Sequence, residues 1–212
     1  MVQSLNLAAL GSLGKVVKNP SLLVPHIVVP DVRSINYLAL RAAGVRVMVF
    51  DKDNTVTAPY VDSVHPPFES AWAACKQTFG AGKVLIVSNS AGTRDDVGHI
   101  KAKKVEDALG VPVFRHDIKK PSGGELIPAH VGHPAPAIAV VGDRLFTDIV
   151  YGNASGMMTI YVSQIVTEQG DNPFAAVIRR LERPLLRWLQ ARGIDPPEHP
   201  AFDKHPPTDF IS

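Results

Sequence analysis

The stretch from Val47 to Thr57 limits most strongly what this chain can fold into. Its first four residues are apolar, and the next seven are Asp51-Lys52-Asp53-Asn54-Thr55-Val56-Thr57. A short apolar run bounded by turn-forming residues is typical of a buried strand in a parallel sheet. Ligands of open α/β sheets bind beyond the carboxyl ends of such strands. The sequence therefore predicts that Asp51 and Asp53 meet at the end of a buried strand.

Two carboxylates that are held close together repel each other unless a cation or a proton offsets their charge. A divalent cation bound near Asp51 and Asp53 would explain why the chain tolerates this pair. The alternative is a strand that simply ends in an Asp/Asn turn. The stretch alone does not decide between these interpretations, so the ends of the other predicted strands matter.

The composition fits one globular domain. Of the 212 residues, 45% are hydrophobic and 20% are charged, so the chain can bury a sizeable core. The formal net charge of +2 is too small to suggest nucleic acid as a partner. The single cysteine, Cys75, excludes an internal disulfide and a zinc site built from cysteines. No apolar run approaches the ~20 residues that a membrane-spanning helix needs.

Short apolar runs alternate with helical patterns along the middle of the chain. Strands are predicted at 47–50, 84–87, 111–114, 137–141 and 158–162. Helices are predicted at 34–43 with Ser34 as N-cap, at 68–79, at 93–109 with Thr93 as N-cap, and after Pro121, where Pro128 interrupts the pattern. This alternation predicts an α/β fold with a doubly wound, Rossmann-like parallel sheet of about five strands.

The two ends of the chain differ from its middle. Residues 1–33 predict an amphipathic helix that stops at Asn19-Pro20, followed by an extended segment broken by prolines. Residues 34–170 form the predicted core domain, 171–192 a basic amphipathic helix, and 193–212 a proline-rich tail that we expect to be irregular and partly disordered.

Both terminal helices have a cationic face. Residues 1–18 contain two lysines and no acid, and the helix at 173–192 carries Arg179, Arg180, Arg183 and Arg187 on the face opposite its apolar one. Such helices can lie on an anionic membrane surface or pack on their own protein with the charges in solvent. Both interpretations stay open. The first helix also suits a targeting segment, and the helices could mediate oligomerisation.

Polar residues follow the other predicted strands as well. Ser88 and Asn89 end the second strand, where a hydroxyl and backbone N–H groups suit a phosphoryl oxygen. Lys119 and Lys120 precede Pro121, and either lysine could neutralise a phosphoryl group.

The fourth predicted strand ends in Gly142-Asp143-Arg144-Leu145-Phe146-Thr147-Asp148. Asp143 would complete an oxygen-rich site with the carboxylates of the first motif. Oxygen ligands without histidine or thiolate point to Mg²⁺ as the cofactor.

These four strand ends, taken in order, resemble the motifs of the haloacid dehalogenase superfamily. Asp51-Lys52-Asp53-Asn54-Thr55 matches its D-x-D-x-T signature, and the later motifs are matched by Ser88, by Lys120 before a proline, and by Gly142-Asp143 through Asp148. The resemblance implies a phosphatase in which Asp51 is the nucleophile and forms an aspartyl-phosphate. Asp53 would protonate the leaving alkoxide and then activate water.

The same resemblance assigns the remaining motif residues. Ser88 and the Asn89 N–H would bind the phosphoryl oxygens, and Lys120, or else Lys119, would balance their charge. Mg²⁺ would be held by Asp51, the carbonyl group of Asp53 and Asp143, while Asp148 orients these ligands from behind.

The spacing of the motifs bears on the substrate. Cap domains in this superfamily lie between the first and second motifs or between the second and third. Residues 55–88 have room for a loop, one helix and a strand, and residues 88–120 for one helix and one short strand. The resemblance thus implies a capless enzyme whose open site suits a phosphate on a large or surface-bound partner.

Further stretches are similar to the mitochondrial phosphatidylglycerophosphatases of fungi and plants: 51–54, 87–89, 115–116, 119–121 and 140–148. This resemblance implies hydrolysis of the terminal phosphate of phosphatidylglycerophosphate to give phosphatidylglycerol, a step of cardiolipin biosynthesis. It also implies a peripheral protein on the matrix side of the mitochondrial inner membrane. The partners would be the anionic phospholipid substrate and the membrane surface.

Such a substrate carries a second phosphate, a diester. Arg115, His116, Arg144 and Lys52 are candidates for contacting it, although each could instead be a solvated charge or a structural hydrogen-bonding group. Two other functions stay open. One is a phosphatase of a soluble sugar phosphate, nucleotide or phosphoprotein, and the other is a non-catalytic binding module on the same fold.

Overall fold

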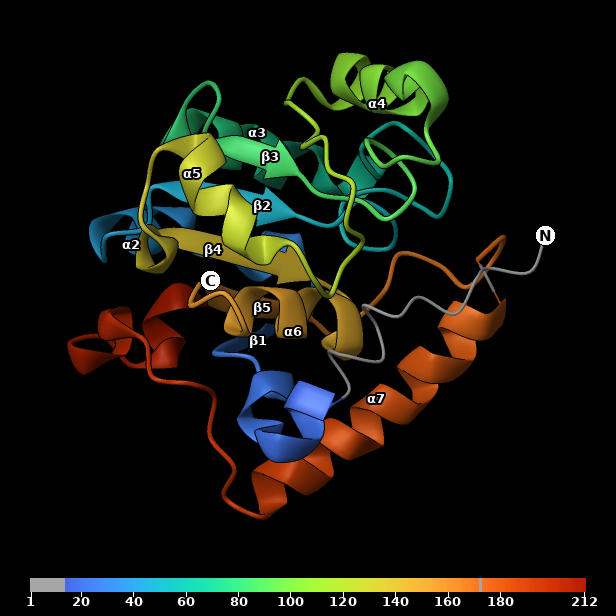
Figure 1. Cartoon of the computed structure of the whole chain (residues 1–212). Coiled ribbons are helices and arrows are strands. Elements are labelled where there is room, and N and C mark those ends of the chain that lie inside the picture. Colours follow the sequence, from blue (N-terminus) through green and yellow to red (C-terminus); the bar gives the residue numbers. More distant parts are fainter. Residues whose placement is uncertain (1–13, 172) are drawn as a thin grey trace.

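The structure is a computed structural model that describes residues 14–171 and 173–212 (Figure 1). Within these residues, five parallel strands form one sheet in the order β1-β5-β4-β2-β3. The strands are β1 (Ile27–Val29), β2 (Val47–Phe50), β3 (Val84–Ile86), β4 (Ile138–Gly142) and β5 (Met158–Val162). The helices are α2 (Tyr37–Ala42), α3 (Glu69–Phe79), α4 (Ile100–Leu109), α5 (Ile127–Val131), α6 (Val150–Asn153) and α7 (Pro173–Ala191). The predicted doubly wound parallel sheet is confirmed.

The sheet brings the ends of β2 and β4 side by side. From β2 the chain crosses to β3 on one side, and β4 then returns to the other side of β2. Phe50 pairs with Val141, and the Asp51 N–H donates to the Val141 carbonyl group at 2.9 Å. Ligands of doubly wound folds bind in the crevice at such a reversal of strand order. The acidic residues after β2 and β4 both lie there.

Helices cover both faces of the sheet (Figure 1). All four residues of β2 are buried, and successive side chains of a strand point to opposite faces. Val47 and Val49 pack in the layer with α5 and α6, whereas Met48 and Phe50 pack in the layer with α2, α3 and α4. The continuous apolar run that predicted this strand is therefore required by burial on two sides.

One predicted strand is wrong and another was not predicted. Residues 111–114 contribute only an isolated bridge between Ile86 and Val113. Pro112 has no N–H to donate, and the Val113 N–H donates to the Glu106 side chain at 2.9 Å instead of to a strand. The segment predicted as merely extended contains β1, which pairs with β5 at the edge of the sheet. An edge position tolerates the prolines that flank this strand.

Two predicted helix signals need correction. Asn36 rather than Ser34 is the N-cap of α2, because the Asn36 side chain accepts the Ala39 N–H at 3.1 Å. Pro128 does not break a helix. It lies in the first turn of α5, where the missing N–H of proline costs no hydrogen bond.

Helix α4 begins at Ile100, seven residues after the predicted cap Thr93. Gly98 and His99 have left-handed backbone angles, with φ values of 65° and 55°, and a right-handed helix cannot continue through them. The carboxylate of Asp96 accepts the N–H groups of the first turn of α4 and takes the role that was predicted for Thr93.

The proline-rich tail is ordered, contrary to the prediction. Phe210 is buried in the main hydrophobic core. The Asn36 N–H donates to the Phe210 carbonyl group and the Ser212 N–H to that of Ser34, both at 2.9 Å. A few well-placed apolar residues are enough to fix this segment, although its composition is typical of disorder.

His26 fastens the tail to the sheet. Its Nδ1 atom accepts the Thr159 N–H at 3.1 Å, and its Nε2 atom donates to the Pro197 carbonyl group at 2.9 Å. The ring stacks on Phe202 with 5.3 Å between the ring centroids. Burial, and to a smaller extent the neighbouring His199, lowers the pKa of His26 from 6.5 to about 4. The folded protein therefore holds this ring in its neutral form.

Acid should for this reason destabilise the fold. Unfolded chains take up a proton on His26 below pH 6.5, whereas the folded protein does so only below about pH 4, so protons favour unfolding within this window. We expect the free energy of unfolding to fall by up to ~3 kcal/mol across it, measured by urea denaturation at a series of pH values. A His26→Gln protein should lack this part of the pH dependence. An equal pH dependence in both proteins would contradict the assignment.

Most of the predicted N-terminal helix lies outside the described residues. Residues 14–18 are helical, and Val16 belongs to the same buried apolar cluster as Leu186 and Leu189 of α7. No helix in the described part of the chain is long and apolar enough to cross a bilayer.

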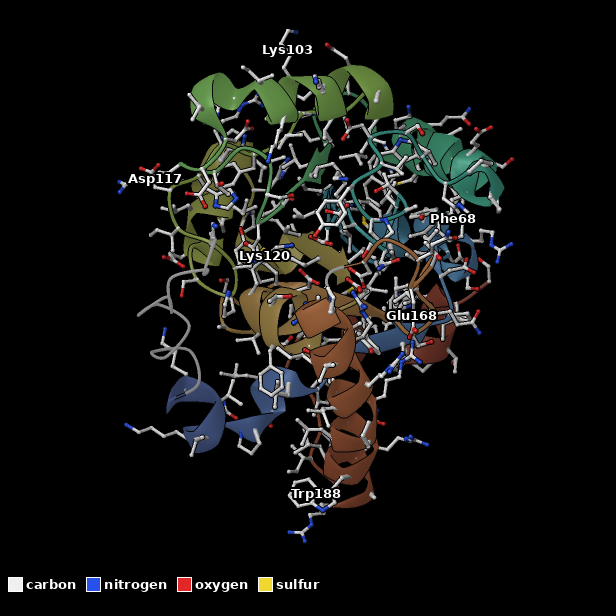
Figure 2. All side chains as sticks on the ribbon, turned by 90° about the vertical axis from the view of Figure 1, so that its right-hand side faces the viewer. Phe68, Lys103, Asp117, Lys120, Glu168 and Trp188 are labelled. Carbon is white, nitrogen blue, oxygen red and sulfur yellow. The ribbon has the colours of Figure 1, made fainter. Side chains whose placement is uncertain are left out.

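Helix α7 matches the predicted range, but its faces differ from the prediction. Arg179, predicted on the solvated face, is buried, and so is Glu182. Three residues of the predicted apolar face are exposed instead, with 54%, 64% and 49% of their surface accessible: Val177, Leu181 and Trp188. Figure 2 shows Trp188 on the part of the helix that is farther from Lys120. Arg180, Arg183 and Arg187 are exposed as predicted, whereas Arg179 points inwards because it meets Asp143 after β4 and Asp171 after β5.

Candidate active site

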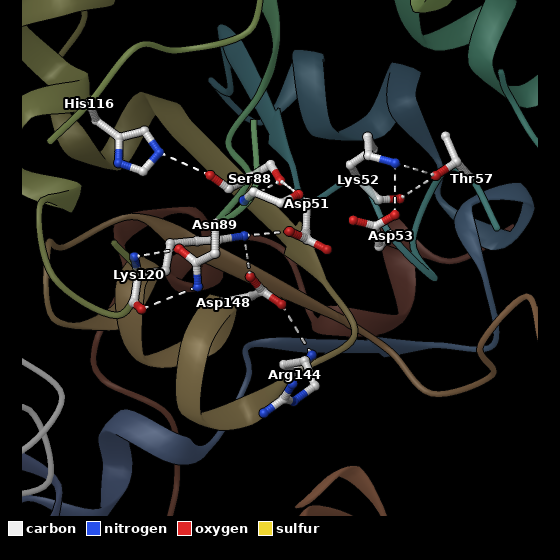
Figure 3. Close-up of polar contacts among 11 residues, drawn as sticks. Asp51, Lys52, Asp53, Thr57, Ser88, Asn89, His116, Lys120, Arg144 and Asp148 are labelled. Atoms are coloured by element: carbon white, nitrogen blue, oxygen red, sulfur yellow. Dashed lines mark hydrogen bonds and ion pairs between the residues drawn. The ribbon is translucent and has the colours of Figure 1, made fainter. Parts of the chain in front are cut away.

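Three carboxylates meet beyond the ends of β2 and β4. Asp51 follows β2, while Asp143 and Asp148 come from the loop after β4, and each offers an oxygen atom within 4.8 Å of the others. Asp143 and Asp148 are buried. The loop brings them together because Leu145–Ile149 forms a turn of π-helix that directs Asp148 back towards β2 (Figure 3).

Gly142 makes this arrangement possible. A Cβ atom at this position would lie 2.4 Å from the Asp148 side chain, far closer than two such atoms can approach. Only glycine leaves room for the carboxylate of Asp148 beside the strand end. The glycine before Asp143 is thus explained by packing.

Lys120 lies between two of the carboxylates. Its Nζ atom donates to Asp51 Oδ1 and to Asp148 Oδ1, both at 2.6 Å. The Lys120 side chain is almost fully buried. Burial alone would lower the pKa of this ammonium, but Asp148 and Asp51 outweigh burial and raise the pKa above its ordinary value. Lys120 therefore stays a cation inside the site.

The structure also decides between the two adjacent lysines. Lys119 points to the surface and pairs with Asp95 at 2.5 Å. Lys120 points inwards, and Asn89 holds it there, because the Asn89 Oδ1 atom accepts the Lys120 backbone N–H at 2.8 Å. The side chain of Asn89 thus ties the end of β3 to the loop that carries Lys120.

The buried carboxylates carry more charge than their surroundings compensate. Burial raises the pKa of Asp143 above its ordinary value, although Arg179 opposes this shift. Burial likewise raises the pKa of Asp148, with Lys120 acting against it. A divalent cation would relieve this excess. Three carboxylates without a histidine or thiolate among them fit a hard cation such as Mg²⁺.

Asp53 lies apart from this cluster, on the other side of Asp51 (Figure 3). Its Oδ1 atom accepts hydrogen bonds from Lys52 Nζ at 2.7 Å and from the Tyr60 N–H at 2.8 Å. Burial raises the pKa of Asp53, although Lys52 opposes the shift. A raised pKa suits a group that must carry a proton for part of a reaction cycle.

Lys52 is not available to a substrate. Its side chain is buried, and its ammonium donates to the Val61 carbonyl group at 2.8 Å as well as to Asp53. These contacts favour the structural role that the sequence left open for Lys52. Its hydrogen bonds fix Asp53 and the loop that follows.

Ser88 lies two residues beyond the end of β3 and is buried beside the cluster. Its hydroxyl oxygen accepts the Ser90 N–H at 3.1 Å, which holds the turn that contains Asn89. Contacts of Ser88 and of the Asn89 N–H with a phosphoryl group stay predictions.

Arg115 and His116 are engaged away from the carboxylates. Arg115 forms a two-pronged ion pair with Glu106 of α4, with 2.7 Å between Nη2 and Oε2. The two ring nitrogens of His116 lie 2.7 Å from the Ile118 carbonyl oxygen and 3.1 Å from that of Ser88. These contacts favour the structural role that the sequence left open for His116.

Arg144 differs from these two residues because it lies in the acidic loop itself. Its backbone N–H donates to Asp148 at 3.2 Å, and its guanidinium approaches Glu182 of α7 at 3.4 Å. Of the residues Arg115, His116 and Arg144, which are candidates for contacting the substrate, Arg144 is the one next to the carboxylate cluster.

The sequence of this chain is similar to those of known proteins. The profile of the family described as mitochondrial PGP phosphatase matches residues 7–167. This chain belongs to that family. The predicted resemblance is thereby confirmed, and so is the assignment of the chain as a phosphatase.

Curated relatives share much of the sequence of this chain. The chain is 43% identical over 184 residues to the chloroplastic phosphatidylglycerophosphate phosphatase 1 of Chlamydomonas reinhardtii, a match that covers 85% of this chain and 67% of the relative. It is 41% identical over 192 residues to the chloroplastic/mitochondrial phosphatidylglycerophosphate phosphatase 1 of Arabidopsis thaliana, covering 89% of this chain and 54% of that protein. Identity to the mitochondrial phosphatidylglycerophosphatase of Saccharomyces cerevisiae is 33% over 178 residues, covering 81% and 91% of the two chains.

One residue of the site, Arg179, was not predicted from the sequence. Arg179 lies on α7, beyond the residues 7–167 that the family profile matches. Its Nε atom donates to Asp143 Oδ2 at 2.7 Å, so α7 reaches the carboxylate cluster. A signal was present in the sequence, because Arg179 and Glu182 share a helical face with Leu186 and Leu189.

Proposed function

We propose that this protein is a Mg²⁺-dependent phosphatase that removes the terminal phosphate of phosphatidylglycerophosphate and releases phosphatidylglycerol. The observation that carries this proposal is the pairing of Asp51 with Lys120 inside a carboxylate cluster, in a chain of the PGP phosphatase family. The names of its relatives support the substrate. The product would feed cardiolipin biosynthesis.

The reaction would proceed in two displacements at phosphorus. The Asp51 carboxylate attacks the phosphoryl group and the ester bond breaks, while Asp53 gives its proton to the leaving alkoxide. Asp53 then takes a proton from water, which attacks the aspartyl-phosphate and restores Asp51. Lys120 offsets negative charge on Asp51 and on the phosphoryl oxygens throughout, and Ser88 and the Asn89 N–H would hold those oxygens.

Mg²⁺ would be bound by Asp51, Asp143 and the carbonyl group of Asp53, with Asp148 supporting these ligands. When bound, the ion supplies positive charge that offsets the carboxylates and the phosphoryl group. The hydrogen bonds of Asp148 to Lys120 and to the Arg144 N–H occupy both of its oxygens, which supports its orienting role.

The openness of the site supports a large substrate. Between Thr55 and Ser88 the chain contains one α-helix and one strand besides short turns, and between Ser88 and Lys120 it contains α4 alone as an α-helix. Neither segment forms a cap over the strand ends. A lipid headgroup can reach such a site from a membrane surface, and Arg144 is the cation best placed to meet its diester phosphate.

Phosphate release from a panel of esters would test the proposed function. The panel should contain short-chain phosphatidylglycerophosphate below its critical micelle concentration, a sugar phosphate, a nucleotide and a phosphopeptide, each with Mg²⁺ and with EDTA. We expect kcat/KM at least about tenfold higher for the lipid ester than for any soluble ester, and no release in EDTA. A higher value for a soluble ester would favour the alternative, a phosphatase of a soluble substrate.

The exposed face of α7 supports association with an anionic membrane. Val177, Leu181 and Trp188 form an exposed stripe along α7, and the exposed Arg180 and Arg187 lie to one side of it. The apolar stripe matches the acyl region of a bilayer, and the arginines match anionic headgroups. We propose that the protein binds a membrane peripherally. The names of the mitochondrial relatives support the mitochondrion as its location, and we propose the matrix side of the inner membrane.

A charge on this stripe should separate membrane binding from catalysis. Leu181→Glu is expected to weaken binding to vesicles of phosphatidylglycerol and phosphatidylcholine by about tenfold or more in a cosedimentation assay, because a carboxylate is repelled by the surface and costly to bury. Release from the dispersed short-chain ester should stay within about twofold of wild type. Leu38→Glu is the matched control, since Leu38 is 72% exposed on α2, outside the stripe. Equal vesicle binding by the two variants would exclude this face of α7.

A further inference from the structure

Two buried charges on the inner face of α7 contact the acidic loop after β4. Arg179 Nε donates to Asp143 Oδ2 at 2.7 Å, and Glu182 Oε1 accepts the Phe146 N–H at 2.9 Å. Both side chains are at most 6% exposed. A buried charge is tolerated only where partners compensate it. The positions of Arg179 and Glu182 are therefore fixed by the catalytic loop and not by solvent.

Arg179 also connects this loop to the first motif. Its Nη1 atom donates to Asp171 Oδ2 at 2.7 Å, and Asn54 Nδ2 donates to the same Asp171 oxygen at 3.2 Å. Asn54 directly follows Asp53 and adopts a left-handed φ of 62°, which asparagine tolerates. A continuous chain of hydrogen bonds thus runs from Asn54 through Asp171 and Arg179 to Asp143.

We propose that Arg179 is a positioning residue for the metal ligand Asp143. By holding Oδ2 of Asp143, it leaves the other oxygen to face Asp51, and through Asp171 it fastens the loops after β2 and β4 to each other. This inference rests on the proposed function in one respect, namely that Asp143 binds the divalent cation. It assigns part of the catalytic apparatus to α7, outside the residues that the family profile matches.

The geometry requires arginine at this position. A planar guanidinium donates along two fixed directions and can bridge two carboxylates, whereas a lysine ammonium offers a single nitrogen on a flexible stem. Without Arg179, Asp143 and Asp171 would both lose their cation. Asp143 would then turn away, and this change removes an oxygen from the metal site.

A purely electrostatic effect of Arg179 on metal binding would have the opposite sign to a positioning effect. This difference makes the inference testable. A guanidinium beside a divalent cation repels it, so a purely electrostatic Arg179 would weaken metal binding, and its removal would strengthen it. A positioning Arg179 predicts weaker binding on removal. The two roles therefore differ in the sign of the change.

Direct binding of Mn²⁺ to the full-length protein, followed by electron paramagnetic resonance without substrate, tests this prediction. Arg179→Met should weaken Mn²⁺ binding by about 10- to 100-fold, the usual effect of losing a residue that orients a metal ligand. Arg179→Lys should recover part of the affinity. Arg94→Met is the control, because Arg94 is an arginine with an exposed side chain that forms a surface ion pair with Asp117 at 3.1 Å. This control should bind Mn²⁺ like wild type.

Thermal unfolding of each variant shows whether it is folded before binding is measured. If Arg179→Met does not fold, Arg179→Lys carries the test, with an expected affinity between those of wild type and of a protein without a metal site, Asp143→Asn. Unchanged or tighter Mn²⁺ binding by a folded Arg179 variant would overturn the inference. A wild-type protein that binds no divalent cation would instead overturn the proposed Mg²⁺-dependent function, and the substrate panel would show this independently.

Discussion

Replacing Asp51 with asparagine should abolish phosphate release. An amide is no nucleophile towards phosphorus, and it cannot form the aspartyl-phosphate through which the reaction is proposed to pass. We expect kcat to fall by at least about 10⁴-fold, the scale on which the loss of a nucleophile is usually felt. Phosphate release from the short-chain lipid ester in the presence of Mg²⁺ measures the effect. Because asparagine has nearly the same shape and still accepts a hydrogen bond from Lys120, the fold should persist.

Asp95→Asn is a suitable control for the Asp51 variant. Asp95 is an exposed acid that pairs with Lys119 on the surface, so its neutralisation should leave turnover unchanged. Acid quenching of the wild-type protein during turnover should trap phosphate covalently, and the Asp51→Asn protein should trap none. If Asp51→Asn kept full activity, Asp51 would not be the nucleophile, and the non-catalytic or alternative readings of this fold would regain support.

Replacing Lys120 with methionine is expected to have the second largest effect. The substitution removes the cation that lies 2.6 Å from both Asp51 and Asp148 and leaves these buried carboxylates facing each other. We expect kcat to fall by about 10³-fold, because the charge that stabilises the transferred phosphoryl group is lost. The free energy of unfolding should fall by ~3 kcal/mol, the usual cost of leaving a buried charge without its partner.

Lys119→Met separates this effect from a general loss of positive charge. Lys119 is adjacent in sequence but pairs with Asp95 at the surface, so its removal should change neither turnover nor stability measurably. Urea denaturation with and without Mg²⁺ adds a further check. A divalent cation should recover part of the stability that Lys120→Met loses, since it offsets the same carboxylates. Equal effects of the two lysine substitutions would contradict the inward position of Lys120.

The part of the site that could be predicted is the part carried by strand ends. An apolar run followed by Asp51 and Asp53 identifies both the strand and its end, because burial on two faces leaves few other places for such a run. Asp143 could be found in the same way after β4. Parallel strands end at one edge of the sheet. Locating these residues in the sequence was therefore enough to predict that they lie close together.

The predictions of secondary structure that were wrong failed at single residues that override the hydrophobic pattern of the sequence. Val113 lies in a strand-like run, but Pro112 before it cannot donate a hydrogen bond to a sheet. Gly98 and His99 lie in a helix-like segment, but their left-handed backbone delays the start of α4. Strand β1 is three residues long and flanked by prolines, so it carries too little pattern to be recognised.

Arg179 shows why the remaining part of the site could not be predicted. Its partners Asp143 and Asp171 are 36 and 8 residues away in sequence, and the helical face that Arg179 shares with Leu186 and Leu189 does not indicate which carboxylates it meets. An arginine on an amphipathic helix is usually solvated, and that expectation placed Arg179 towards water. Only the packing of α7 against the loop after β4 gives this arginine a reason to be buried.

The absence of a cap over the strand ends, among the described residues, changes what selectivity means for this enzyme. An enclosed pocket selects an ester by its shape, whereas an uncovered nucleophile reacts with whatever phosphate is held near it. A protein attached to a two-dimensional surface meets lipid esters at an effective concentration of the order of millimolar, however scarce they are in the cell as a whole. The location of the protein would then largely determine which phosphate esters it hydrolyses. Moving the protein into solution should broaden the range of its substrates.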